Sequence, residues 1–137
     1  MIHPAPTSKI DPRLARGTLD ATGDGHLTMA VPNSSYRIRM AGPTPKAEVG
    51  KRLVGRVSGH ARRIDVVESG GRYIEPVYGS PRRIQGRVVA IEQNAIVVHA
   101  GIPIHCMPTD ARQNPAQFEI GDFVALDLMD GVSFVEA

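Results

Sequence analysis

The feature that most constrains this 137-residue chain is the stretch from Arg82 to Phe134, in which short apolar runs alternate with tight turns. The runs 84–91, 95–99, 102–106 and 123–129 have the length of strands, and glycine or proline interrupts them too often for helices. Asp130-Gly131 is a two-residue turn signal that predicts a hairpin into 132–135. With 14 glycines and 11 prolines in all, the chain is expected to form short strands with little or no helix.

The preceding half shows the same kind of pattern. Strands are predicted at about 14–19, 26–31 and 36–40, with Thr22-Gly23-Asp24-Gly25 as the turn between the first two. A further strand opens at Val49-Gly50, and the segments 64–68 and 73–78 are predicted to form a hairpin around 69–72. Because aromatics make up 4% of the chain and Trp is absent, the core must consist mainly of Val, Ile, Leu and Ala.

The two halves match as an internal repeat. Segment 16–19 aligns with 85–88, so that Gly17 corresponds to Gly86, and segment 49–57 aligns with 120–128, so that Gly50 corresponds to Gly121. Two blocks in the same order at nearly equal offset indicate two similar units.

The order of strands within each unit resembles the OB-fold, a five-stranded Greek-key barrel whose first strand is long and bent. The resemblance is to the superfamily and implies an all-β protein of two OB-like barrels in tandem; an SH3-like or other small barrel is the alternative. We therefore predict a flexible tail at 1–12, a first barrel at 13–78, a linker at 79–81 and a second barrel at 82–137.

Charge is distributed unevenly along the chain. The net charge of +2 conceals a basic middle and an acidic end, since residues 88–137 carry one basic and seven acidic side chains. Residues 52–87 carry three acidic side chains and eight basic ones, all of which are arginine: Arg52, Arg56, Arg62, Arg63, Arg72, Arg82, Arg83 and Arg87. Arginine suits phosphate and carboxylate contacts, so an anionic partner is expected at these eight residues.

Single-stranded nucleic acid is the first candidate for this partner, because OB barrels commonly hold single strands on basic faces. Such faces also carry stacking aromatics, and the aromatic residues near the arginines are Tyr36, Tyr73 and Tyr78. The leading hypothesis is thus a non-enzymatic binding module.

The alternative is a structural or assembly protein. The repeat aligns Lys51 with Asp122 and Arg56 with Asp127, so corresponding positions carry opposite charges. Basic and acidic surfaces would then pair between the two barrels or in a homo-oligomer.

Two further resemblances point to small anionic ligands. Arg83-x-x-x-Arg87 is similar to one half of the cyclic-dinucleotide motif of PilZ domains, whose other half is missing downstream. Tandem barrels of this size also resemble molybdate-binding repeats of the TOBE or Mop type, although the Ser-Ala-Arg-Asn opening of those repeats is absent. These resemblances imply cyclic-dinucleotide or oxyanion binding as a further alternative.

No catalytic, cofactor or metal site is predicted. His105 and Cys106 are adjacent in a strand and point to opposite faces, so they cannot easily share one ion with His99. Asp20-x-Thr22-x-Asp24-Gly25 begins like a calcium loop, but the twelfth position is Val31 instead of a carboxylate.

The single cysteine excludes an intramolecular disulfide, and no apolar run reaches the length of a membrane span. A cytoplasmic protein without membrane contact is expected.

Overall fold

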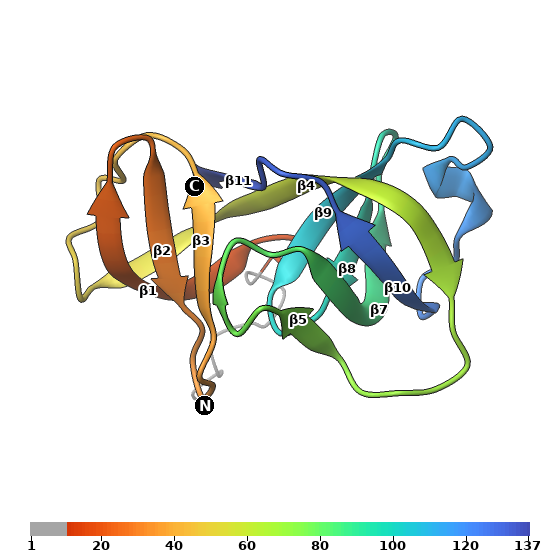
Figure 1. Cartoon of the computed structure of the whole chain (residues 1–137), viewed down its shortest axis with the longest axis horizontal. Coiled ribbons are helices and arrows are strands. Elements are labelled where there is room, and N and C mark those ends of the chain that lie inside the picture. The colour runs from red at the N-terminus through yellow and green to blue at the C-terminus, as the bar shows by residue number, and fades with distance from the viewer. Residues whose placement is uncertain (1–10) are drawn as a thin grey trace, which may run out of the picture.

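The computed structural model describes residues 11–137, which form one large mixed β-sheet with a single short 3-10 turn and no α-helix (Figure 1). The predicted tail at 1–12 lies almost entirely outside the described residues. The elements are β1 (Ala15–Gly23), β2 (His26–Ala30), β3 (Arg37–Ala41), β4 (Arg52–Val66), β5 (Tyr73–Glu75), β6 (Tyr78–Gly79), β7 (Arg83–Ile91), β8 (Ile96–His99), β9 (Pro103–Pro108), η2 (Pro115–Gln117), β10 (Phe123–Leu128) and β11 (Ser133–Glu136).

The 15-residue strand β4 holds the two halves of the molecule together. Its first half pairs with β1 and β11, and its second half pairs with β10 and with β9. We call β1, β2, β3, β11 and the first half of β4 the N-terminal strand group, and β7 to β10 with the second half of β4 the C-terminal strand group. In Figure 1, β4 runs across the molecule from one group to the other.

The last strand of the chain belongs to the N-terminal strand group. β11 pairs with β4 at Phe134–Val57 and with β3 at Ser133–Ala41, although it follows β10 in the sequence. In the same way, β4 leaves the N-terminal group and completes the C-terminal one. Each group therefore contains a strand that is continuous with the other group.

The prediction of an all-β protein is confirmed, and two local predictions are wrong. Residues 64–66 do not form a hairpin with 73–78, because they are the end of β4, and Tyr73–Glu75 pairs with β7 instead. Asp130 lies at a bend and Gly131 has a positive φ of 93°, but the strands on either side of them do not pair with each other, since β11 pairs with β4 instead. In both cases the segment pairs with a strand that is distant in the sequence and not with the neighbouring segment.

Equivalent backbone hydrogen bonds occur in the two segments that the sequence aligns. Gly50 donates to the Leu19 carbonyl, and Gly121 donates to the Val88 carbonyl, with N–O distances of 2.7 and 2.8 Å. The register of β1 against β2 shifts between Leu19 and Ala21, and that of β7 against β8 shifts between Val88 and Ala90. Each bulge therefore lies at the same place relative to the aligned glycines.

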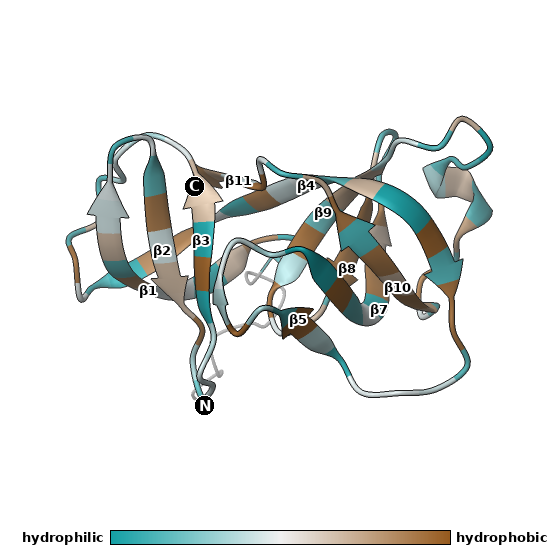
Figure 2. Ribbon diagram, in the orientation of Figure 1, coloured by the Kyte–Doolittle hydropathy of each residue, from teal (hydrophilic) through white to brown (hydrophobic). Residues whose placement is uncertain are grey.

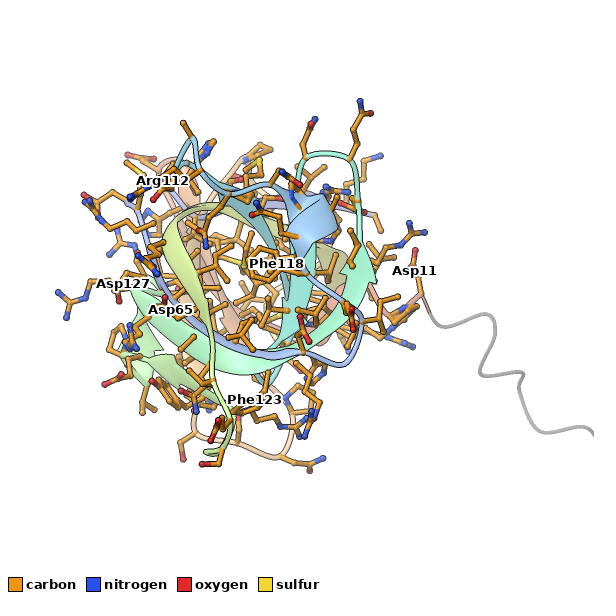
Figure 3. All side chains as sticks on the ribbon, turned by 90° about the vertical axis from the view of Figure 1, so that its right-hand side faces the viewer. Asp11, Asp65, Arg112, Phe118, Phe123 and Asp127 are labelled. Atoms are coloured by element: carbon orange, nitrogen blue, oxygen red, sulfur yellow. The ribbon has the colours of Figure 1, made fainter. Side chains whose placement is uncertain are left out.

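The core follows the period-two alternation of the strands. Apolar and polar bands alternate along β4 and β7 in Figure 2, and the fully buried side chains are mostly aliphatic, as Ile38, Leu53 and Ile84 illustrate. Figure 3 views the C-terminal strand group end-on, with Phe118 over its interior and Phe123 toward its outer edge. Within residues 11–137, no helix has the length and apolar character needed to span a bilayer.

Candidate functional site

Three side chains form a row across neighbouring strands on the outer face of the C-terminal strand group. Phe123 of β10 lies opposite Arg87 of β7, and Arg87 lies opposite His99 of β8. Gly86 and Val88 on either side of Arg87 are buried, so the alternation of the strand directs Arg87 outward. The row places a cation between an aromatic ring and an imidazole.

Gly86 allows β7 and β8 to approach closely beside this row. A Cβ atom at that position would collide with the backbone carbonyl of His99. Glycine is therefore required here for steric reasons, and it fixes the strand that carries Arg87 against the strand that carries His99.

The connection between β4 and β5 brings Arg72 to the same face. The Arg72 Nη1 lies 3.3 Å from Nδ1 of His99, and the Gln85 side chain donates to the carbonyl of Gly71 at 2.9 Å. Because a guanidinium only donates, Nδ1 of His99 must accept, and the ring is neutral with its proton on Nε2. Burial, and next the charge of Arg72, lower the pKa of His99 below its ordinary value of 6.5.

The Arg87 guanidinium is oriented by two contacts. Its Nη1 donates to the Gly121 carbonyl at 2.9 Å, and its central carbon lies 5.3 Å from the centre of the Phe123 ring. A guanidinium stacked on a ring keeps its other face and remaining N–H groups available for a ligand.

These residues line a depression of about 420 Å³, which we call the first depression. Its lining consists of Gly70, Arg72, Arg87, Val89, His99 and Phe123, and contains no carboxylate. Among residues 11–137, neither Arg72 nor Arg87 takes part in an ion pair. The first depression is therefore electropositive and combines two guanidiniums with an aromatic edge.

A second depression of about 330 Å³ adjoins the first and shares Val89 and His99 with it. Its far side is lined by Arg16 of β1 and by Asp11. The Nε of Arg16 is buried and has no hydrogen-bond partner among residues 11–137. Asp11 is bound at 3.1 Å by the guanidinium of Arg13, which lowers the pKa of that carboxyl. We call the two depressions together the groove.

The eight arginines predicted as a site have three kinds of surroundings. Arg72 and Arg87 meet in the first depression, whereas Arg52, Arg62 and Arg82 are exposed elsewhere. The other three form ion pairs, in which Arg56 contacts Glu92, Arg63 contacts Asp65 and Arg83 contacts Asp127, each at 2.9 Å.

The alternation along β7 puts Arg83 and Arg87 on the same face of the strand. Arg83 is held there by Asp127 and by the hydroxyl of Tyr73, while Arg87 lies in the groove. The two halves of the Arg83-x-x-x-Arg87 pattern thus have different surroundings.

The sequence did not single out Arg16, His99 or Phe123 as parts of an anion site. Arg16 precedes Gly17 and aligns with Gln85, whereas Arg87 aligns with Thr18, so the repeat gave no signal for Arg16. His99 was considered as a metal ligand or a general base, and not as part of an anion site. His99 is close to Arg72 because of the path of the loop between β4 and β5, and no local sequence pattern predicts that path.

The remaining histidine and cysteine have structural surroundings. The buried ring of His105 contacts Glu92 Oε1 at 3.0 Å and the carbonyl of Arg13 at 2.8 Å, which ties the start of β1 to β9. Cys106 is fully buried, and its burial raises the pKa of the thiol far above the ordinary range. Within residues 11–137, no three His, Cys, Asp or Glu side chains gather as a metal ion would require.

Comparison with known proteins gave no match to any family model, any curated protein sequence or any solved structure.

Proposed function

We propose that this protein is a non-enzymatic binding module whose groove holds a phosphate-bearing ligand, with single-stranded nucleic acid as the ligand. The observation that carries the proposal is the first depression, where two guanidiniums and an aromatic ring surround an open space, and where residues 11–137 contribute no ion-pair partner and no carboxylate to the lining. Guanidiniums bind phosphate oxygens through paired hydrogen bonds, and flat side chains stack on bases.

The fold proposed with this function is a pair of small OB-like barrels. The pairings of β4 with both β1 and β11, and with both β9 and β10, are those expected if each strand group curls into a barrel. The first depression would then lie on the outer wall of the C-terminal barrel, so that a single strand could lie across β10, β7 and β8, and the second depression would extend to β1 of the N-terminal barrel.

The experiment is fluorescence anisotropy with labelled single-stranded DNA and RNA of about 12 nucleotides, a length within the range that one such barrel covers. We expect affinity to fall with salt by roughly 0.7 logarithmic units per phosphate contacted for each tenfold rise in salt.

Arg87→Met should weaken binding by about tenfold or more, because it removes a charge-assisted hydrogen-bond donor. Arg62→Met is the matched control, since Arg62 is exposed on β4 and does not line the groove. Equal affinity of both variants and the unaltered protein would exclude the groove as the binding site.

A second candidate function is structural, with the charges used within the protein or between copies of it. One observation favours it: Arg56 of the basic segment and Glu92 of the acidic segment form an ion pair at 2.9 Å. Sizing of the protein across a salt series tests this alternative. An oligomer that dissociates with salt, together with no binding of nucleic acid at low salt, would favour assembly over ligand binding.

A further inference from the structure

We infer that the groove contains two anion subsites, so that its ligand carries two successive phosphates and is held by Arg16 in addition to Arg87 and Arg72. This inference rests on the proposed function and specifies the smallest ligand that fills the site. The first subsite is the first depression, and the second subsite is the second depression.

The two subsites are adjacent because one wall serves both. Val89 and His99 line both depressions; Val89 is the bulged residue between Val88 and Ala90 of β7, and His99 of β8 pairs with Arg87. Nδ1 of His99 is occupied by Arg72, whereas its Nε2 carries the ring proton as a donor.

Arg16 is the cation of the second subsite. β1 carries it in register with Val54 of β4, while the buried Gly17 beside it lies close to Met29 and to the carbonyl of Ala30, so the strand holds Arg16 in place. Its buried Nε has no partner among residues 11–137, and a buried donor without an acceptor is costly. The Arg16 side chain lines the second depression, and a phosphate oxygen bound there would accept from its guanidinium.

Asp11 also lines this depression and opposes an anion there. Its carboxylate accepts from the backbone N–H of Arg13 at 2.9 Å and from the Nε of Arg13 at 3.1 Å, and one of its oxygens is 3.4 Å from the Nη2 of that guanidinium. This acid is compensated by its own arginine, whereas Arg16 forms no ion pair within residues 11–137 and is the cation available to a ligand in the second subsite.

Calorimetric titration of the full chain with two unlabelled probes tests the inference. The probes are the thymidine dinucleotide TpT, which has one phosphodiester, and the trinucleotide TpTpT, which has two. We expect TpTpT to bind about tenfold or more tightly than TpT, as a second charge-assisted contact would allow. Arg16→Met should remove this difference between the two probes.

Arg16→Lys keeps the charge and should preserve most of the difference between the probes, which separates the loss of an anion contact from a structural effect. Thermal unfolding of each variant identifies any loss of folding. Equal affinities of the unaltered protein for TpT and TpTpT, or a ratio that Arg16→Met does not change, would overturn the second subsite while leaving the first. Binding of neither probe by the unaltered protein would overturn the proposed function together with this inference.

Discussion

The Arg72 Nη1 lies 3.3 Å from Nδ1 of His99, so that a loop residue and a strand residue 27 positions apart share one hydrogen bond across the first depression. The bond requires a neutral imidazole. A bound anion would favour the protonated ring instead, and Arg72 would then be released to the ligand. This contact therefore links the charge of His99 to occupation of the groove.

The first prediction is that affinity for single-stranded nucleic acid rises as pH falls. The pKa of His99 in the free protein lies below 6.5 because of burial and the charge of Arg72, and a bound phosphate would raise that pKa. Affinity should increase as pH decreases through the pKa of the bound form and level off below the pKa of the free form. Anisotropy between about pH 8 and pH 5 measures this, and His99→Gln should flatten the curve. A flat curve for the unaltered protein would contradict the linkage.

The second prediction concerns stability in acid. Burial alone would raise the pKa of Glu92, but the hydrogen bond and charge of His105, together with Arg56, outweigh it and lower the pKa below its ordinary value of 4.5. Because the folded-state pKa is lowered, the stabilisation by Glu92 is complete above about pH 5 and is lost as pH falls through the folded-state value.

Glu92→Gln should therefore lower the free energy of unfolding at neutral pH and reduce its dependence on pH below about 5. Urea unfolding at several pH values measures both effects. Asp24→Asn, which removes an exposed carboxyl with no ion pair among residues 11–137, is the control and should leave the pH profile almost unaltered.

The third prediction concerns the close approach of β7 and β8. Gly86→Ala should destabilise the protein by about 1–3 kcal/mol, because the new methyl group would press on the carbonyl of His99 and force the strands apart. Gly71→Ala is the matched control, since nothing lies within 4 Å of a Cβ atom there. Thermal unfolding compares the two variants. Equal midpoints would contradict the prediction, because they would show that β8 moves to accommodate the methyl group without loss of stability.

The fourth prediction follows from the place of β11 in the N-terminal strand group. Phe134 is buried at 2% exposure, whereas its neighbour Val135 is 65% exposed. Phe134→Ala should cost about 3–5 kcal/mol and increase hydrogen exchange in β3 and in the first half of β4, where β11 pairs. Val135→Ala should change little. Increased exchange confined to β10 would contradict the pairing of β11.

The fifth prediction is that Cys106 is unreactive in the folded protein. The thiolate is the reactive form, and complete burial raises the pKa of this thiol. A thiol-reactive dye at pH 8 should label the protein only at the rate of unfolding and should react at once in denaturant. Rapid labelling without denaturant would show that the core around Cys106 opens.

Much of the local structure was predictable because it depends on near neighbours in the chain. The alternation of apolar and polar residues predicted the strands around Leu27 and Ile38. The segment Thr22-Gly23-Asp24-Gly25 predicted the turn between β1 and β2, which do pair as a hairpin. The aligned glycines Gly17 and Gly86 do lie at close approaches of strands. These features follow from side-chain period and from glycine geometry, which the sequence contains directly.

Strand partners were less predictable, because hairpin signals describe only adjacent segments. Asp130-Gly131 favours a turn, but the apolar face of β11, with Phe134, is buried against β4 and β3. Burial of that face outweighs a local pairing, as long-range packing often outweighs local preference.

The sequence by itself determined that this chain forms β-strands, that its core is aliphatic and that its arginines are concentrated in residues 52–87. Only the tertiary structure decided which of these arginines meet. Arg56 and Arg83 form ion pairs with carboxylates from distant segments. Arg72 and Arg87 line the groove together with Arg16 and His99. The reason is that charge and period are properties of neighbouring residues, whereas a binding site depends on the long-range strand pairing that brings separate segments together.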